Sequence, residues 1–146
     1  MKVTSPTFSD NGFLDERFTS MGANRNPEFV IYDFPDATLT LAVIMQDLDT
    51  ADETVHWLVW NMDTDTPKIF EGEIPTEATA GTNDFGSQTY VGPRPEDFNI
   101  HRYQFTFYAL ADELTLGPSN NRFDFERAID GLVLDTCTYM GRYDKG

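Results

Sequence analysis

The feature that most constrains the fold is a run of apolar residues at positions 39–45, Leu-Thr-Leu-Ala-Val-Ile-Met. Beyond Leu41 this run is apolar at every position, whereas a half-buried strand would alternate apolar and polar residues. Because successive side chains of a strand point to opposite faces, the run predicts a central β-strand that is covered on both sides.

Further segments predict additional strands. Residues 103–110 alternate clearly, with Tyr103, Phe105 and Phe107 on one face. Core packing explains that aromatic face better than an aromatic ligand site does. Turn-rich segments separate the apolar runs at the spacing of an all-β domain, and other strands are expected over residues 29–34, 55–62 and 132–140.

One helix is expected, over residues 123–130. Residues 117–121 supply a turn and candidate N-caps, Asp124 and Glu126 suit the positive end of the helix dipole, and Gly131 is a stop signal. Residues 67–83 are rich in Pro, Thr, Glu and Gly with little periodicity, which predicts a surface loop.

Length and charge limit the function classes. The 146 residues predict a single domain, 1–146, and 25 acidic against 10 basic residues give a net charge of −15. Such a surface repels nucleic acid phosphates and anionic lipids, so we expect no nucleic acid partner and no stable membrane association. Adaptation to a high-salt cytoplasm would explain the scarcity of lysine, although 12 phenylalanines are many for a protein adapted to high salt.

The single cysteine, Cys137, excludes an intramolecular disulfide. It falls in a predicted strand without nearby histidines or a basic cluster, so we expect a small buried side chain rather than a reactive thiol. The first residues lack an apolar leader and no run has the length of a membrane span, which predicts a cytoplasmic protein.

The chain has only two histidines, and each opens a predicted strand. His56 comes nine positions after the carboxylate of Asp47. His101 follows a loop, Gly92-Pro93-Arg94-Pro95, that two prolines stiffen. Two scarce imidazoles at strand ends, one behind a rigid loop, indicate a site.

Three interpretations of this site are open from the residues alone. The histidines could bind backbone groups and never meet. Asp47, Asp49 and His56 could hold zinc or iron, although their spacing matches no defined motif. Alternatively, imidazoles, loop amides and the Tyr103 hydroxyl could donate to an anion while Asp47 fixes the tautomer of one histidine.

Several enzyme signatures are missing. The chain has no Gly-x-Ser-x-Gly, His-Glu-x-x-His, Cys-x-x-Cys or Gly-x-Gly-x-x-Gly sequence. We therefore expect no catalytic activity, no cofactor and no metal.

Across nearly its whole length the chain resembles the phosphatidylethanolamine-binding proteins, in the compact bacterial and archaeal form often called Raf-kinase-inhibitor-like. The order and spacing of several short motifs carry this resemblance, at residues 5–8, 17–19, 26–27, 47–51, 56–57, 81–86, 92–103, 108–110 and 141–143. The resemblance implies a mainly β fold, in which a large antiparallel-rich sheet packs on a smaller sheet with a few peripheral helices.

The resemblance also implies a shallow cavity that accepts phosphate-like and carboxylate ligands. The positions that match its lining and rim are Asp47, His56, Gly92, Pro93, Pro95, His101 and Tyr103. Three departures stand out: the acidic loop Asp47-Leu48-Asp49-Thr50-Ala51 lacks the family's two prolines, Glu96 replaces a proline beside the cavity, and Leu132 replaces a histidine of many bacterial relatives.

Arg94 and the segment 81–86 each have both a structural and a functional interpretation. For Arg94 we favour a surface salt bridge over pairing with a bound anion. Residues 81–86 are expected to form a turn in which Asn83 and Asp84 cap their own backbone, and which supports the cavity.

Together these observations predict a non-enzymatic protein that binds a small ligand through a phosphate, phosphomonoester or carboxylate group. Alternatives are a protein-interaction module that inhibits a kinase or protease, and an acid/base hydrolase or lyase that uses His101 and Asp47. The oligomeric state is open, with a homodimer among the candidates. We expect anion binding to strengthen as pH falls through about 6.5, and His101→Ala to cost less than about 1.5 kcal/mol of stability.

Overall fold

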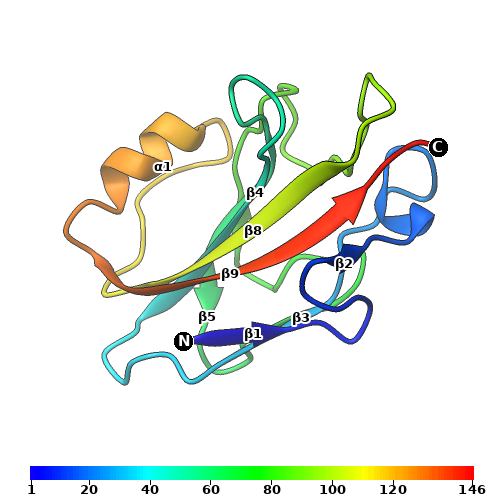
Figure 1. Ribbon diagram of the computed structural model, residues 1–146. Helices are drawn as coiled ribbons and strands as arrows, with labels where there is room; N and C mark the ends of the chain where they lie inside the picture. The colour runs from blue at the N-terminus through cyan, green and yellow to red at the C-terminus, as the bar shows by residue number, and fades with distance from the viewer.

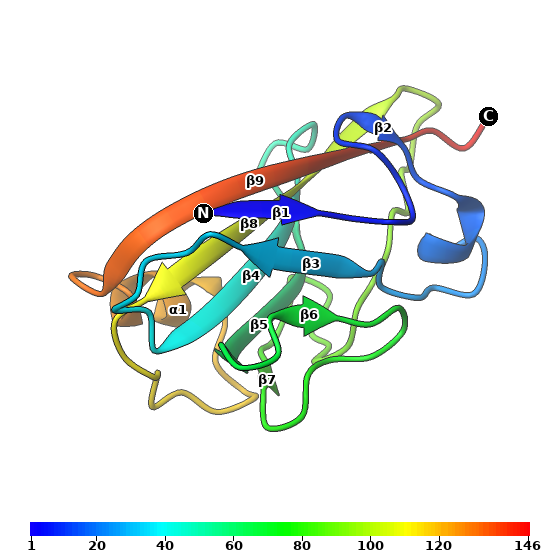
Figure 2. The same cartoon turned by 90° about the horizontal axis from the view of Figure 1, so that it is seen from below.

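The computed structural model describes residues 1–146 as two packed β-sheets with one α-helix (Figure 1). The larger sheet has the strand order β2-β9-β8-β4-β5-β7, and the smaller sheet has the order β1-β3-β6. All neighbouring strands are antiparallel except β2 and β9. Figure 2 shows the smaller sheet lying across one face of the larger one, which confirms the predicted fold class.

The larger sheet consists of β2 (Gly12–Phe13), β4 (Thr40–Asp47), β5 (Val55–Asp63), β7 (Thr79–Ala80), β8 (His101–Leu110) and β9 (Val133–Tyr143). The smaller sheet consists of β1 (Lys2–Thr4), β3 (Phe29–Tyr32) and β6 (Lys68–Ile69). A short 3-10 helix, η1 (Glu16–Phe18), and one α-helix, α1 (Arg122–Ala128), complete the fold.

The central strand predicted from the apolar run is confirmed as β4, which lies between β5 and β8. Its side chains alternate between two cores. Val43 and Met45 join a cluster between the two sheets, whereas Ala42 and Ile44 join a second cluster on the opposite face. This alternation explains why the run has no polar face.

The cluster between the sheets is strongly aromatic. Phe105 and Phe107 of β8 contact Phe29 of β3 at ring-centroid distances of 4.9 and 5.1 Å. Such pairs contribute beyond their buried area, so the aromatic face of β8 packs the core, as predicted.

The opposite face of the sheet is covered by α1, through Phe125 packed on Trp60 of β5. The helix is confirmed, although it ends two residues earlier than predicted. Asn121 caps its first turn in a reciprocal capping box with Asp124, and Gly131 has the positive φ of 79° expected of a helix stop. No helix in the structure combines the length and the apolar character needed to cross a bilayer.

The prediction of a surface loop over residues 67–83 is only partly right. Two-residue strands β6 and β7 lie inside it, and Ile69 is fully buried in the core between the sheets. Like β1 and β2, these strands are too short to produce a recognisable alternation in the sequence.

Cys137 lies in β9, as predicted, and is half-buried against the core between the sheets. Desolvation raises the pKa of its thiol to about 11. A thiol with so high a pKa holds little reactive thiolate near neutral pH.

Candidate functional site

The antiparallel sheet brings the predicted acidic and histidine side chains to one end of the molecule. Asp47 ends β4, whereas His56 and His101 open the neighbouring strands β5 and β8. An antiparallel strand begins where its neighbour ends, so all three lie at the same edge of the sheet. The loops that surround this edge rise together at the top of Figure 1.

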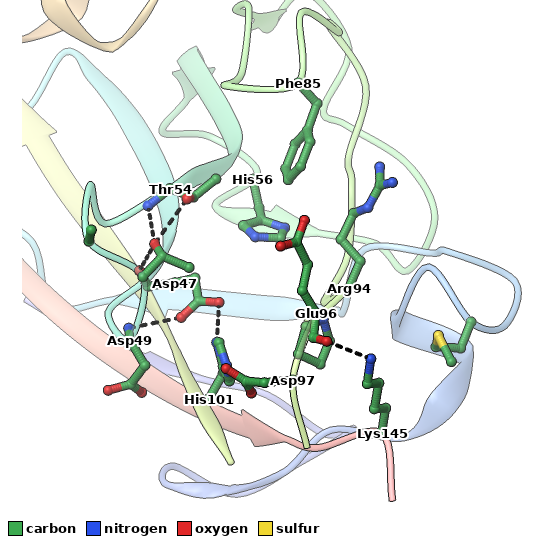
Figure 3. A pocket seen from close by; sticks show the side chains of 14 residues that line it. Asp47, Asp49, Thr54, His56, Phe85, Arg94, Glu96, Asp97, His101 and Lys145 are labelled. Atoms are coloured by element: carbon green, nitrogen blue, oxygen red, sulfur yellow. Dashed lines mark hydrogen bonds and ion pairs between the residues drawn. The ribbon is translucent and has the colours of Figure 1, made fainter. Parts of the chain in front are cut away.

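A cavity of about 910 Å³ opens at this edge. Figure 3 shows Asp47, Asp49 and Thr54 on one side of it and Arg94 and Glu96 on the other. Its lining residues are Met21, Asp47, Asp49, Thr50, Ala51, Thr54, His56, Phe85, Arg94, Pro95, Glu96, Asp97, His101 and Lys145.

His101 is held between two carboxylates. Its Nδ1 lies 2.6 Å from Asp47 Oδ2, and its Nε2 lies 2.9 Å from Asp97 Oδ1. The side chains of His101 and Asp47 are 6% and 3% exposed, whereas that of Asp97 is 53% exposed. As predicted, Asp47 bonds and orients one histidine, but the second nitrogen of that ring is also engaged.

These contacts shift the pKa values in opposite directions. Burial of the ring lowers the pKa of His101, but the hydrogen bonds to Asp47 and Asp97 outweigh this effect, so the pKa is raised. The hydrogen bond from His101 holds the pKa of Asp97 below its usual value. The charged imidazolium form therefore persists to higher pH than in a free histidine.

His56 has a different environment. Its Nδ1 lies 2.7 Å from the carbonyl oxygen of Val91, which can only accept a hydrogen bond. Desolvation lowers the pKa of His56, so near neutral pH the ring is uncharged, with its proton on Nδ1. Its Nε2, which has no protein partner, then offers a lone pair to the cavity.

This geometry bears on the expected pH dependence of anion binding, which stays a prediction. The pKa of His56 is lowered, so this ring gains its charge below the ordinary pH of about 6.5. His101 is charged over a wider range, but both of its nitrogens are already bonded. Protonation of His56 therefore adds a donor to the cavity only below that ordinary pH, and protonation of His101 adds none while both of its nitrogens are bonded.

Tyr103 supports the site from below and does not line the cavity. It is fully buried and contacts both imidazole rings, with centroid distances of 5.4 Å to His56 and 6.4 Å to His101. Burial, followed by the nearby charge of Asp47, raises the pKa of its hydroxyl, which makes no hydrogen bond of normal geometry. Because the hydroxyl is buried and Tyr103 is not among the lining residues, its predicted donation to a ligand stays a prediction.

The glycine-proline loop contributes Pro95 to the lining, whereas Gly92 and Pro93 are buried behind it. A Cβ on Gly92 would lie 2.1 Å from the carbonyl oxygen of Phe18. Glycine is needed here for close packing on Phe18.

Arg94 corrects a second prediction, because it forms no salt bridge. No carboxylate oxygen lies within 4 Å of it, and its guanidinium group instead lies 5.1 Å from the ring centroid of Phe85 at the cavity. The neighbouring Pro93 and Pro95 are buried, which directs Arg94 outward toward this ring.

The turn at residues 81–86 is confirmed in part. Asn83 Oδ1 accepts from the backbone of Phe85 and Ser87, as predicted. Asp84 does not cap its own backbone, because its Oδ2 accepts from Val55 N at the start of β5. The same turn presents Phe85 to the cavity.

The carboxylates considered as metal ligands are already engaged. Asp47 Oδ1 accepts from Asp49 N, and Asp49 pairs with Arg102, which lowers the pKa of Asp49. No group of three or more His, Cys, Asp or Glu side chains has an arrangement that could hold a metal ion.

Sequence reasoning missed several lining residues, among them Asp97, Phe85 and Lys145. Asp97 lies four positions before His101, a spacing within reach of its ring, whereas Phe85 and Lys145 come from segments far along the chain. Lys145 Nζ donates to the backbone oxygen of Glu96 at 2.9 Å. Glu96 was expected beside the cavity, and its carboxylate has no ion-pair partner.

Comparison with known proteins agrees with the fold and the motifs. The chain is 33% identical to a UPF0098 protein of Pyrococcus horikoshii over 99% of its own length and 77% of that protein's length. It is 32% identical to a UPF0098 protein of Methanothermobacter thermautotrophicus over the full length of both.

Two solved structures share the fold. A phosphatidylethanolamine-binding protein homologue of Chlamydia trachomatis superposes with a TM-score of 0.92 at 28% identity, over 99% of this chain and 97% of that one. YbcL of E. coli superposes with a TM-score of 0.92 at 22% identity, over 99% and 98% of the two chains, and supports the fold alone. The model of the phosphatidylethanolamine-binding protein family matches residues 4–144, and the chain belongs to this family.

Proposed function

We propose that this protein binds a small ligand through an anionic group, such as a phosphate, phosphomonoester or carboxylate, in the cavity between β4, β5 and β8. One observation carries the proposal. Of the ten basic side chains, three have no carboxylate partner, and two of these three line the cavity: Arg94 and Lys145. The other seven all form ion pairs, namely Lys2, Arg17, Arg25, Lys68, Arg102, Arg122 and Arg127.

The surplus of acidic residues makes this distribution informative. With 25 carboxylate side chains for 10 bases, a basic side chain at the surface readily finds a partner. Arg94 and Lys145 instead rest on aromatic rings, those of Phe85 and Phe98. Their positive charges remain available to a ligand, and a guanidinium group can bind two oxygens of a phosphate or carboxylate.

His56 adds an acceptor to this pair of cations. Its neutral ring presents Nε2 to the cavity, where it can accept a hydrogen bond from a ligand hydroxyl or from a singly protonated phosphate. The cavity therefore suits an anionic group that also carries a hydrogen-bond donor.

The environment of His101 supports a role without catalysis. A general base needs a free nitrogen within reach of a substrate proton, but both nitrogens of His101 face carboxylates at 2.6 and 2.9 Å. With Asp97 in place, this arrangement leaves His101 no free nitrogen to act as the base of the hydrolase or lyase that was considered from the sequence.

A protein-interaction role is the second candidate, and exposed apolar side chains beside the cavity favour it. Phe98 is 75% exposed and Ile100 is 49% exposed. Large exposed apolar groups next to a pocket are typical of contact surfaces. Loss of a specific protein complex in a Phe98→Ser, Ile100→Ser variant that still binds phosphate would favour this candidate.

Calorimetric titration with inorganic phosphate tests the main proposal. We expect a dissociation constant in the high micromolar to millimolar range, typical of a few hydrogen bonds in an open pocket. Arg94→Gln should weaken binding about tenfold, the effect of one charge-assisted hydrogen bond.

Arg142→Gln is the matched control for Arg94→Gln. Arg142 also lacks a carboxylate partner and rests on an aromatic ring, that of Phe13, but it does not line the cavity. Equal losses in both variants would show that phosphate responds to overall charge, and the absence of binding to the wild type would refute the proposal.

A further inference from the structure

Asp97 occupies the nitrogen of His101 that a ligand would otherwise use. We propose that Asp97 is a built-in competitor for anionic ligands, so that a bound anion gains His101 as a donor only by displacing this carboxylate. The inference rests on the proposed function, and it identifies the residue that sets which anions the cavity accepts.

The two carboxylates that hold His101 differ in their surroundings. Asp47 is buried in the body of the protein and also accepts from Asp49 N, so its bond to Nδ1 is part of the folded structure. Asp97 is 53% exposed and lies on the rim. Nδ1 is therefore committed to Asp47, and only Nε2 can be made available to a ligand.

The segment that carries Asp97 is weakly attached. Residues 96–100 are all exposed, and they form no backbone–backbone hydrogen bond. Besides the contact with His101, the segment is held by Lys145, whose Nζ donates to the oxygen of Glu96 and lies over the ring of Phe98. Asp97 Oδ1 also accepts from Asn99 N within the segment. Few contacts would be lost if Asp97 moved away from His101, as expected of a segment that opens locally.

Displacement of Asp97 exchanges one anion for another at the same donor. A carboxylate tethered four residues from His101 has a high effective concentration, so it lowers the apparent affinity of every ligand that needs Nε2. A ligand with a single carboxylate would give His101 Nε2 the same kind of acceptor that Asp97 already provides. A doubly charged phosphate can contact His101 and a rim cation together, so the competitor selects phosphate and phosphomonoester groups over simple carboxylates.

The test compares Asp97→Ala and Asp97→Asn with Glu96→Gln by calorimetric titration with inorganic phosphate. Glu96 is the matched control, because it is an exposed acidic residue of the same cavity, adjacent in sequence and without an ion-pair partner. We expect Asp97→Ala to bind phosphate about tenfold more tightly, the worth of freeing one charged hydrogen-bond donor. Glu96→Gln should gain no more than about twofold, from reduced repulsion screened by salt.

A second measurement follows the His101 ring directly by ¹⁵N NMR. In Asp97→Ala and Asp97→Asn, phosphate should shift the Nε2 resonance at lower concentrations than in the wild type and leave Nδ1 bonded to Asp47. Equal gains in phosphate affinity in the Asp97 and Glu96 variants, or no gain in Asp97→Ala, would refute the role of Asp97 as a competitor. If the wild type still bound phosphate, the proposed function would stand. Absence of phosphate binding in the wild type and in both Asp97 variants would overturn both.

Discussion

Removal of His101 is predicted to destabilise the protein more than a surface substitution would. In the wild type, Asp47 is 2% exposed and accepts from Asp49 N, and His101→Ala removes the imidazole that lies 2.6 Å from its other carboxylate oxygen. Removing one partner of a buried ion pair costs about 3 kcal/mol or more. This value exceeds the limit of about 1.5 kcal/mol expected from the sequence, because the sequence does not show that both partners are buried.

A double-mutant cycle separates the pair from simple loss of packing. Asp47→Asn keeps an acceptor for His101 but removes the buried charge, so it should cost only about 1–2 kcal/mol. The double variant should be more stable than the sum of the single effects predicts, by about 1 kcal/mol or more. Urea unfolding followed by the fluorescence of Trp57 and Trp60, both buried, measures all four proteins.

The pH dependence has a defined sign. The pKa of His101 is raised in the folded protein, so its stabilisation is fully present below the unfolded value of about 6.5 and is lost as pH rises through the folded pKa. The stability difference between wild type and His101→Ala should therefore be larger near pH 6 than near pH 9. Two results together would refute this account of the His101–Asp47 pair. The stability losses of His101→Ala and Asp47→Asn would be additive, and the stability difference between wild type and His101→Ala would stay constant or grow as pH rises.

Three further predictions concern packing, thiol reactivity and surface charge. Gly92→Ala should destabilise the protein by about 1–3 kcal/mol in urea unfolding because its Cβ would overlap the Phe18 carbonyl oxygen, whereas Gly117→Ala, with open space around its Cβ, should change stability by less than about 1 kcal/mol. Cys137, whose thiol pKa is raised to about 11, should react with a thiol reagent far more slowly in the native protein than in urea, and equal rates would contradict its burial in β9. If the acidic surface is an adaptation to high salt, the melting temperature should keep rising in KCl from about 0.1 M to above about 1 M, and a plateau at a few tenths molar would indicate simple charge screening.

The sequence predicted the parts of the fold that depend on local pattern. The run that became β4, the alternation of β8 and the caps of α1 all lie within single segments, so their periodicity and end signals are readable. Strands β1, β2, β6 and β7 have only two or three residues and leave no such pattern.

The site was predictable where strand ends define it. Asp47, His56 and His101 could be placed together because each lies at the end of a recognisable strand. The contact of Arg94 with Phe85 and the placement of Lys145 depend on how separate loops meet, which no local pattern reveals.

The role of Gly92 shows the same limit in the backbone. A glycine before a proline indicates a special conformation, but not which neighbour requires it. The neighbour that leaves no room for a side chain at Gly92 is the carbonyl oxygen of Phe18, 74 positions earlier in the chain.

The most direct test of the proposed function is a crystal structure grown with arsenate, a phosphate analogue whose arsenic is located by its anomalous scattering. We predict a peak inside the cavity, with oxygens within hydrogen-bond distance of Arg94 or Lys145 and with Asp97 turned away from His101. An arsenate found only outside the cavity, for example beside Arg142, would contradict the proposal that this cavity is the anion-binding site.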